Sequence, residues 1–275
     1  MAVLDKLRLD GQVAIVTGAG RGLGRAMALA LSEAGAELVV AARTRSQIEA
    51  TAEAARVEGG HCLAVPTDVT DPQSVRNMVD AAIGEFGRID ILVNNAGGYT
   101  PGTGKPVEEI TDEEWHLGIE TNLSATFYCC RAAIPHMLRQ GGGKIINVTS
   151  GLGLRAVRDN FIYTSAKAGL IHFSRALAFT YARHNIQCNL ISPGLFPHQD
   201  PETSDQSPAG RFVPTGRAGR DEEMGPLCVF LSSQLASYMN GQIVALDGGG
   251  LAGGQAPTGF APLVPLAADA LEGKN

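Results

Sequence analysis

The sequence predicts an α/β fold in which a parallel sheet of seven strands carries helices on both faces. Short apolar runs alternate with longer amphipathic stretches along most of the chain, an order typical of strand–helix–strand units with right-handed crossovers. The apolar runs are almost continuous, whereas a half-exposed strand would alternate polar and apolar residues, so they favour parallel strands buried on both faces. Together these features predict a doubly wound sheet of the Rossmann type.

The predicted strands all precede a turn or loop that contains glycine or polar residues. They comprise residues 13–17, 38–42, 62–66, 89–94, 144–149, 186–192 and 242–246. In a doubly wound sheet the ligand crevice lies outside the carboxyl ends of the strands, where the strand order reverses. The motifs described below follow such ends, so a ligand site is expected at that edge.

Signals for helix ends separate the strands. Gly35 is positioned as the C-cap of the first helix, which is predicted by apolar residues at helical spacing: Leu23, Met27, Ala30, Leu31 and Ala34. Capping signals open three further helices at Thr44 with Gln47, Asp71 with Pro72, and Thr111 with Glu114. The helix after Thr111 is expected to run towards Arg139, with a kink or an end at Pro135.

The bulk properties indicate one catalytic domain over residues 1–250, a substrate loop over 195–220 and a C-terminal tail over 251–275. The net charge of −6 lacks the basic excess of a nucleic-acid-binding protein. No apolar run approaches the ~18 residues of a membrane span, and the N-terminus lacks a signal-peptide pattern. The cysteines do not have the paired spacing of a disulfide framework or a metal site; they are Cys62, Cys129, Cys130, Cys188 and Cys228. A cytoplasmic protein without membrane, nucleic-acid or metal partners is expected.

A glycine-rich turn at residues 17–24 follows the first predicted strand and opens the first helix. Glycine allows a tight turn and lets the backbone approach a pyrophosphate, while the N–H groups of the helix N-terminus face the phosphates. The spacing is Gly-x-x-x-Gly-x-Gly, which differs from the commoner dinucleotide fingerprint. The residues of this turn expected to bind the cofactor are Gly18, Gly20, Arg21, Gly22 and Leu23.

The end of the second strand favours NADP(H) over NAD(H). An NAD enzyme usually has an acidic residue about 20 positions after the turn to bind the ribose hydroxyls, whereas arginine accommodates the 2′-phosphate of NADP. Ala42 occupies the expected acidic position and Arg43 follows it. Arg21 would approach the same phosphate from the glycine-rich turn; the alternative is that both arginines are solvated surface charges.

Tyr163 and Lys167 form a pair four residues apart near the start of a predicted helix, so they share one helix face. A phenol has a pKa near 10 and is a poor base at neutral pH. A nearby ammonium group, together with an oxidised nicotinamide, is expected to lower that pKa and make Tyr163 an acid/base. Ser150, at the end of the fifth strand, is positioned to hold the reacting oxygen.

With these motifs the chain resembles the single-domain branch of the short-chain dehydrogenase/reductase family over about residues 10–250. The residues that carry the resemblance are 17–24, Asp68, Val69, 94–97, Asn122, Ser150, Tyr163, Lys167, Asn189, Pro193 and Gly194. The resemblance implies interconversion of a ketone and a secondary alcohol by hydride transfer, with Tyr163 as general acid/base. It implies that Ser150 binds the substrate oxygen and that Lys167 binds the nicotinamide ribose and tunes Tyr163.

The same resemblance assigns further contacts. Asn122 would hold the water of a proton relay. The remaining cofactor contacts would come from Asp68 and Val69 at the adenine, and from Asn95, Ala96, Gly97, Pro193 and Gly194 along the rest of the molecule. For Asn95 a structural role that bridges neighbouring strands is an equal alternative. His198 stands where the family often has a threonine, and could contact the nicotinamide or belong to the loop surface.

Two other functions remain open. One is reduction of 3-oxoacyl chains on an acyl carrier protein, although the basic residues for docking an acidic carrier (Arg139, Lys144, Arg183) are sparse. The other is a catalytically silent, cofactor-binding regulatory protein, which would be expected to lack Tyr163 or Lys167.

The substrate mouth and the quaternary structure complete the expectations. Leu152 and Leu154 are expected to form an apolar wall beside Ser150. Arg155 and Arg158 are expected to meet an anionic substrate, or else to face solvent or pair with acidic residues of a neighbouring subunit. The resemblance implies a homotetramer, supported by apolar residues on more than one face of the Tyr163 helix: Phe173, Leu177 and Phe179.

Overall fold

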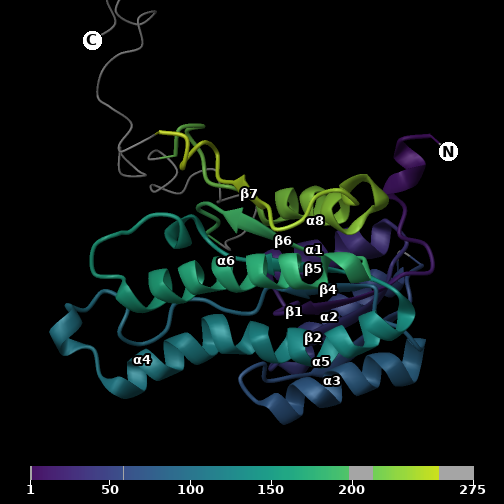
Figure 1. Ribbon diagram of the computed structural model, residues 1–275, viewed down its shortest axis with the longest axis horizontal. Coiled ribbons are helices and arrows are strands. Elements are labelled where there is room, and N and C mark those ends of the chain that lie inside the picture. The colour runs from purple at the N-terminus through teal and green to yellow at the C-terminus, as the bar shows by residue number, and fades with distance from the viewer. Residues whose placement is uncertain (1, 58, 198–212, 254–275) are drawn as a thin grey trace, which may run out of the picture.

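A seven-stranded parallel sheet forms the centre of the computed structural model, which describes residues 2–57, 59–197 and 213–253 (Figure 1). The strand order is β3-β2-β1-β4-β5-β6-β7, and every neighbouring pair is parallel. This confirms the predicted fold class. The order reverses between β1 and β4, because the chain extends from β1 towards β3 on one side and from β4 towards β7 on the other.

Each predicted strand is present, with ends that differ from the prediction by no more than two residues. The strands are β1 (Val13–Thr17), β2 (Glu37–Ala42), β3 (Cys62–Pro66), β4 (Ile91–Asn94), β5 (Gly143–Val148), β6 (Ile186–Pro193) and β7 (Ile243–Leu246). Residues of β1, β4 and β6 are buried throughout, whereas β7 has no fully buried residue. The expectation of full burial is therefore wrong for β7 and also for β3, in which only Cys62 is buried, because these two strands lie at the edges of the sheet.

Helices and short turns connect the strands. The α-helices are α1 (Gly22–Glu33), α2 (Arg45–Val57), α3 (Pro72–Phe86), α4 (Asp112–Ile119), α5 (Ala125–Gln140), α6 (Phe161–Tyr181) and α8 (Met224–Ser232). The 3-10 turns are η1 (Leu4–Leu7), η2 (Val107–Glu109), η4 (Gly151–Gly153), η5 (Ala182–His184), η7 (Asp221–Glu223) and η8 (Gln234–Ala236), and η3 (Glu120–Ser124) is a π-helical turn. None of the helices in the described ranges has both the length and the apolar character needed to cross a membrane.

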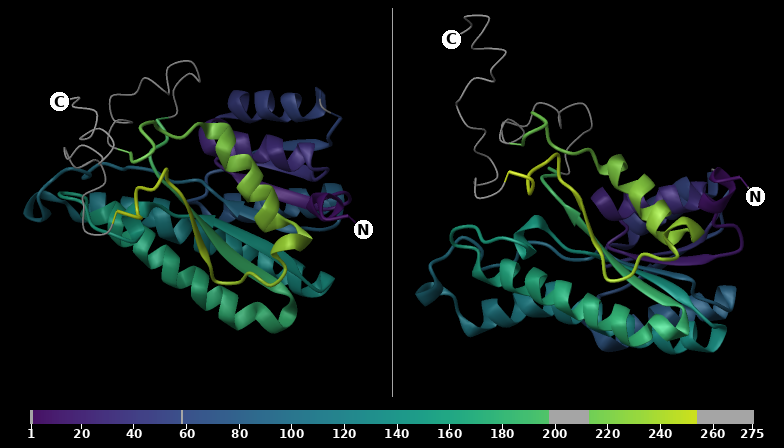
Figure 2. Two further views of the ribbon diagram at one scale, coloured as in Figure 1. Left: turned by 90° about the horizontal axis from the view of Figure 1, so that it is seen from above. Right: turned by 45° about the horizontal axis from the view of Figure 1, so that its top comes forward.

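Two hydrophobic cores lie on opposite faces of the sheet, and the right-hand view of Figure 2 shows the helices that cover these faces. Successive residues of a strand point to opposite faces. Ala14 and Val16 of β1 accordingly pack with Met27 of α1 and with α2 and α8. Ile15, between them, packs with Met78 of α3 and with α5 and α6. The alternation places helices on both faces and leaves the strand ends available for function.

The predicted helix starts and ends are largely as expected. Asp71 caps α3 by accepting a hydrogen bond from the Gln73 N–H at 2.8 Å, and Pro72 is the first helical residue. Thr111 and Glu114 form the predicted capping box before α4. Gly35 follows the end of α1 with φ +103°. At α2 the Thr44 carbonyl accepts the N–H groups of Gln47 and Ile48.

The expected long helix from Thr111 to Arg139 is instead interrupted by a π-helical turn. The three pieces α4, η3 and α5 follow one another without a loop. Pro135 neither ends α5, which continues to Gln140, nor coincides with the break. The buried neighbours Ile134 and Met137 hold this part of α5 against the core. Gly141, with φ +88°, ends the helix.

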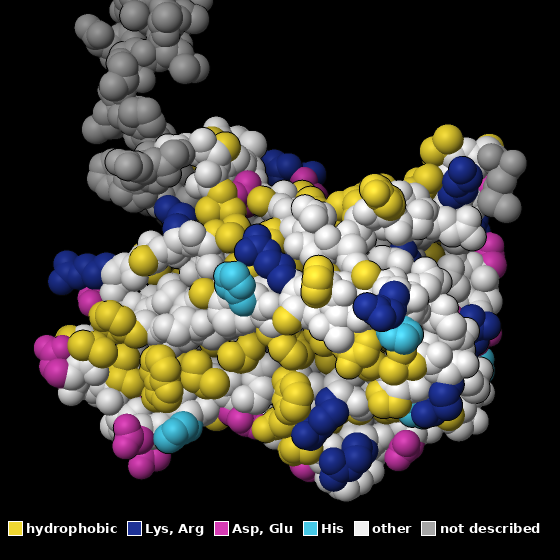
Figure 3. Space-filling view, viewed as in Figure 1, with side chains coloured by type: hydrophobic (Ala, Val, Ile, Leu, Met, Phe, Trp, Pro, Cys, Tyr) yellow, Lys and Arg dark blue, Asp and Glu magenta, His cyan; other side chains and the backbone are white. Residues whose placement is uncertain are grey.

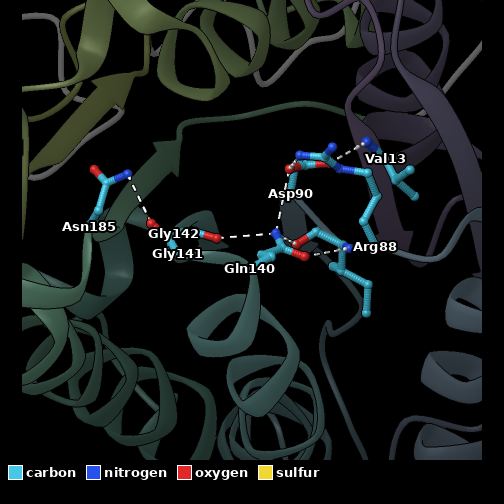
Figure 4. Close-up of polar contacts among 8 residues, drawn as sticks. Val13, Arg88, Asp90, Gln140, Gly141, Gly142 and Asn185 are labelled. Carbon is cyan, nitrogen blue, oxygen red and sulfur yellow. Dashed lines mark hydrogen bonds and ion pairs between the residues drawn. The ribbon is translucent and has the colours of Figure 1, made fainter.

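Polar side chains join the amino ends of the strands at the opposite edge from the predicted site (Figure 4). The Asp90 carboxylate accepts the Val13 N–H at 2.9 Å and both guanidinium branches of Arg88 at 2.7 Å. The Gln140 side chain accepts the Ile89 N–H at 3.2 Å and donates to the Ile89 carbonyl at 2.6 Å. Gln140 thereby satisfies both backbone groups of a residue whose side chain is fully buried.

Replacing Gln140 should therefore lower thermal stability. Gln140→Ala leaves the Ile89 N–H and carbonyl without their protein partners, which costs ~1–3 kcal/mol and should lower Tm by roughly 2–12 °C. Circular dichroism during heating measures the change. Arg139→Ala is the matched control, because the one polar contact of the Arg139 side chain within the described ranges is with the half-buried His136 ring. Equal shifts in the two variants would contradict a structural role for the Gln140 amide.

Candidate active site

The carboxyl ends of β1 and β4 meet at the point where the strand order reverses, which is where a doubly wound sheet binds its ligand. Residues 17–24 leave β1 there and residues 94–98 leave β4. The glycine-rich turn and the asparagine-containing loop, far apart in the sequence, are thus brought together as predicted.

The glycine-rich turn is packed so closely that side chains would not fit. Gly18 and Gly22 have φ values of +65° and +56°, which favour glycine. A Cβ atom on Gly18 would lie 2.8 Å from Nδ2 of Asn95. One on Gly20 would lie 2.9 Å from Cβ of Gln47, and one on Gly24 would collide with the Gly18 carbonyl. At Gly18, Gly20 and Gly24 the turn therefore packs directly against its own backbone, the loop of residues 94–98 and the start of α2.

Hydrogen bonds of Thr17 and Asn95 connect this turn to the loop of residues 94–98, called the β4 loop below. The Thr17 hydroxyl accepts the N–H groups of Asn95 and Ala96 at 3.1 and 3.2 Å. The Asn95 amide donates to the carbonyls of Thr17 and Gly18 at 3.1 and 3.3 Å. The bridging interpretation of Asn95 is therefore realised, and both of its amide hydrogens are used within the protein.

The N-terminus of α1 is open for an anionic group. Its N-cap residue, Arg21, is extended and makes no side-chain capping bond. The first N–H groups of a helix have no partner within the helix, and the helix dipole adds positive potential there. Leu23, in the first turn, packs against the core and orients the helix. This end of α1 can receive a phosphate group.

Arg43 follows the end of β2 and lies near Asp68. Asp68 accepts hydrogen bonds from the Thr70 hydroxyl and N–H, which lower its pKa, and the positive charge of Arg43 lowers that pKa further. Arg21 and Arg43 are exposed, and neither guanidinium has a hydrogen-bond or ion-pair partner within the described ranges. Val69 packs against the second core.

Tyr163 and Ser150 meet between the start of α6 and the end of β5. Burial raises the pKa of Tyr163 to about 12, a hydrogen bond with the Ser150 hydroxyl acts in the opposite direction, and the nearby Tyr99 raises the pKa further. The expected lowering of this pKa depends on Lys167 together with an oxidised nicotinamide, and it stays a prediction for the enzyme with its cofactor bound. Desolvation is the largest effect, and the phenol is protonated at neutral pH.

Lys167 is buried beside Tyr163 and directs its ammonium group towards the backbone. Nζ donates to the Val148 carbonyl at 2.9 Å and lies 5.5 Å from the centre of the Tyr163 ring. Burial lowers the pKa of Lys167 to about 8. The Thr149 hydroxyl donates to the Lys167 carbonyl at 3.2 Å, which ties α6 to the end of β5.

Asn122 lies in the π-helical turn and holds the β4 loop. Its amide donates to the carbonyls of Gly98 and Gly118 at 2.9 and 3.1 Å, and its Oδ1 accepts the Gly98 N–H at 2.9 Å. A Cβ atom on Gly97 would lie 2.9 Å from Asn122 Oδ1 and 3.5 Å from Lys167 Nζ. The loop thus passes close to both predicted residues. Both amide hydrogens of Asn122 are used, so a relay water would have to meet Oδ1 or the backbone.

The end of β6 completes this edge. The Gly194 N–H donates to the Leu246 carbonyl at 2.9 Å, and a Cβ atom on Gly194 would lie 2.6 Å from Cα of Asp247. Pro193 is the last, buried residue of β6. The Asn189 amide donates to the Met239 carbonyl at 2.9 Å and thereby braces the segment before β7. His198, most of the expected 195–220 loop and the tail beyond residue 253 lie outside the described residues.

The two arginines of the expected substrate mouth differ. The Arg158 side chain is 93% exposed and pairs with Asp159 at 3.1 Å, as the solvent-facing alternative predicts. Arg155 is partly buried, and within the described ranges its guanidinium has no polar partner. Leu154 is exposed, while the Leu152 N–H donates to the Ser150 hydroxyl at 3.2 Å.

Two residues of this region were missed in the sequence. Tyr99 follows the β4 loop, and its ring centre lies 4.8 Å from that of Tyr163. The available signal was an aromatic residue directly after Asn-Asn-Ala-Gly-Gly.

Leu251 lies over Gly151, where a Cβ atom would be 3.6 Å from the leucine side chain. Asp247 holds this segment by accepting the Leu251 N–H at 2.8 Å. The glycine-rich sequence around Leu251 gave no signal.

Comparison with known proteins places the chain among nicotinamide-dependent oxidoreductases. Residues 18–250 match the family described as enoyl-(acyl carrier protein) reductase. A 3-oxoacyl-[acyl-carrier-protein] reductase of Synechocystis sp. is 35% identical over 88% of this chain and 97% of its own length.

Two solved structures show the same fold. A gluconate 5-dehydrogenase from Burkholderia cenocepacia J2315, in complex with NADP and tartrate, has a TM-score of 0.82 and 33% identity, covering 91% of this chain and 99% of its own. A 7α-hydroxysteroid dehydrogenase complexed with NADH and 7-oxo glycochenodeoxycholic acid has a TM-score of 0.83 and 32% identity, covering 90% and 98%.

Proposed function

Because the chain belongs to the short-chain dehydrogenase/reductase family of oxidoreductases, we propose that it interconverts a ketone and a secondary alcohol by hydride transfer with NADP(H). Tyr163 acts as the general acid/base in this proposal. The observation that carries it is the cluster of Tyr163, Ser150 and the buried Lys167 beside the loops that leave β1 and β4.

The residues at the sheet edge fit a dinucleotide. The turn at residues 17–24 has no room for side chains where it meets the β4 loop, and the N-terminus of α1 is uncapped. We assign the phosphates to Gly18, Gly20, Gly22 and Leu23, the adenine to Asp68 and Val69, and the nicotinamide half to Asn95, Ala96, Gly97, Pro193 and Gly194. When bound, the nicotinamide supplies or accepts the hydride.

In the reduction direction Tyr163 donates its proton to the substrate oxygen as that oxygen becomes an alkoxide. A pKa of about 12 keeps the phenol protonated at neutral pH, so the proton is present when the carbonyl arrives. The Ser150 hydroxyl, which acts on the pKa of the phenol, would direct that proton and hold the same oxygen. Substrate oxygen, Ser150 and Tyr163 then form one hydrogen-bonded group.

Lys167 supplies positive charge next to the reacting phenol. Its ammonium is held by the Val148 carbonyl at 2.9 Å, and we propose that its remaining N–H groups bind the nicotinamide ribose. As Tyr163 loses its proton, the nearby charge stabilises the phenolate. Asn122, through Oδ1 or its backbone, would hold the water that returns a proton.

NADP(H) is preferred over NAD(H) in this proposal. Arg43 directly follows Ala42, which occupies the position where an acidic residue would suit NAD, and the charge of Arg43 already acts on Asp68. Arg21 lies in the glycine-rich turn. The related gluconate 5-dehydrogenase was solved with NADP, while the 7α-hydroxysteroid dehydrogenase was solved with NADH. The choice between the cofactors therefore depends on the arginines of this chain.

Reduction of 3-oxoacyl chains on an acyl carrier protein remains the second candidate, favoured by the Synechocystis relative. The basic residues considered for carrier docking count against it. Arg139 lies in the last turn of α5, Lys144 is the second residue of β5 and Arg183 precedes β6, so all three lie at the amino edge of the sheet. A carrier docked there would be on the opposite edge from Tyr163. A silent regulatory role is less well supported, because Tyr163, Ser150 and Lys167 are assembled together.

We also propose a homotetramer located in the cytoplasm. The reducing cytosol suits the five free cysteines, all of them buried. Figure 3 shows hydrophobic side chains in a band over α5 and α6. Phe173 and Leu177 pack mainly in the core, but Phe127, Phe161 and Phe179 are 40%, 40% and 90% exposed. An apolar helix pair of this kind suits pairing with a second copy.

Tyr163→Phe should lower kcat by 10²–10⁴-fold, because it removes the proton donor. The affinity for NADPH should stay close to that of the wild type. Stopped-flow or steady-state NADPH absorbance measures turnover, and fluorescence titration measures cofactor binding. Tyr181→Phe, at the far end of α6, is the matched control. A Tyr163→Phe enzyme that kept more than about a tenth of wild-type kcat would show that another group transfers the proton.

Arg43→Asp should shift the preference from NADP(H) towards NAD(H). The change removes a charge-assisted bond to the 2′-phosphate, worth about 1.5–3 kcal/mol or roughly 10- to 150-fold, and adds a repulsive charge. The ratio of kcat/KM for the two cofactors is the measurement. Arg183→Asp changes net charge equally at the opposite edge and should leave the ratio unaltered. An unchanged ratio in Arg43→Asp would refute the assignment.

Light scattering should give a particle about four times the 28.7 kDa mass of one chain. Phe179→Asp introduces a charge on the exposed face of α6 and should yield smaller particles. Tyr238→Asp is the control, because Tyr238 is also fully exposed but lies outside α5 and α6. A particle of one chain mass for the wild type would contradict the tetramer.

A further inference from the structure

Tyr99 presents a large aromatic surface directly beside the proposed acid/base. Its side chain is 66% exposed, yet its ring centre lies 4.8 Å from that of Tyr163 with an angle of 57° between the ring planes. An exposed tyrosine whose ring packs beside the Tyr163 ring borders the space through which a substrate carbonyl must approach Tyr163.

The loop that carries Tyr99 is held on both sides. Asn122 binds the N–H and the carbonyl of Gly98, each at 2.9 Å. The Gly104 N–H donates to the Asp159 carbonyl at 2.7 Å, and Gly102 approaches Ile162 so closely that a Cβ atom would lie 2.9 Å from its Cδ1. The ring is therefore positioned before a ligand arrives, which reduces the entropy lost on binding.

Two other segments next to Ser150 also carry apolar side chains. Leu154 and Val157, each 46% exposed, lie between Ser150 and Tyr163 in the sequence. Leu251 covers Gly151, the neighbour of Ser150. Apolar surface that is left in water favours a ligand able to cover it, by about 25 cal/mol per Å². An exposed aromatic ring face beside the reacting group suits a flat or puckered ring more than a flexible chain.

We propose that Tyr99 determines substrate specificity by packing against a ring of the substrate, so that the enzyme prefers cyclic ketones to linear ones. The inference rests on the proposed function for the reaction itself and adds the class of substrate. Tyr99 contributes its ring face, while its hydroxyl is not required. A linear ketone of equal carbon number covers less of that face and loses more internal rotation on binding.

The test compares 4-ethylcyclohexanone with 4-octanone, two ketones of equal carbon number, using NADPH. The wild type should have the higher kcat/KM for the cyclic ketone. Tyr99→Leu should raise its KM by roughly 2- to 12-fold, the range of an aromatic packing contact, and change the KM for 4-octanone and for NADPH by less than about twofold. Tyr99→Phe should behave as the wild type with both ketones, and Tyr238→Leu serves as the control for loss of an exposed tyrosine.

Three results would overturn the proposal: equal losses on both ketones in Tyr99→Leu, a loss in Tyr99→Phe as large as in Tyr99→Leu, or a wild-type preference for the linear ketone. Calorimetric titration of each ketone into enzyme with NADP⁺ measures binding without turnover. Selective binding of the cyclic ketone that Tyr99→Leu weakens, in an enzyme that turns over neither, would support the role of Tyr99 and contradict the proposed reaction. No measurable binding of the cyclic ketone would contradict the role of Tyr99.

Discussion

The close approach of the loops that follow β1 and β4 is the constraint on which the site depends. Gly18 and Gly24 have no space for a Cβ atom because Asn95 and the Gly18 carbonyl occupy it. The Thr17 hydroxyl, which accepts two N–H groups of the β4 loop, fixes the distance between them. This contact directs Gly97 across Asn122 and Lys167. The phosphate-binding turn and the proton-transfer residues therefore share one frame.

Burial imposes a second condition, because it shifts the pKa values of Tyr163 and Lys167 in opposite directions, to about 12 and about 8. Each shift favours the neutral form. For Lys167, with a folded pKa below its unfolded value, the destabilisation is complete below about pH 8 and disappears as pH rises above 10.5. It amounts to about 3 kcal/mol at neutral pH. Keeping Lys167 charged in this buried site therefore lowers the free energy of unfolding. The hydrophobic cores on both faces of the sheet offset this loss.

Local patterns allowed most of the fold and much of the site to be predicted. Continuous apolar runs located the strands, and Asp71 and Thr111 marked helix starts because capping depends on a few adjacent residues. The π-helical turn at Asn122 was not predictable, since it reflects bonds to Gly98, a residue remote in sequence. The raised pKa of Tyr163 was missed for a related reason. A sequence motif indicates which charged groups lie near a titratable side chain, but it does not indicate how completely that side chain is buried.

In the segments around the substrate space, the residues that hold the backbone in place differ from the residues whose side chains would contact a substrate. Asn122, Ser150 and Asp247 each bind the backbone of a segment, at Gly98, Leu152 and Leu251 respectively. The side chains carried by these segments, such as Tyr99 and Leu154, are exposed and contribute little to the fold. Because backbone bonds do not depend on which side chain follows, a substitution at Tyr99 or Leu154 can alter the shape of the substrate space and leave the proton-transfer geometry in place. The fold thus accommodates different ketones through a few positions beside a fixed site.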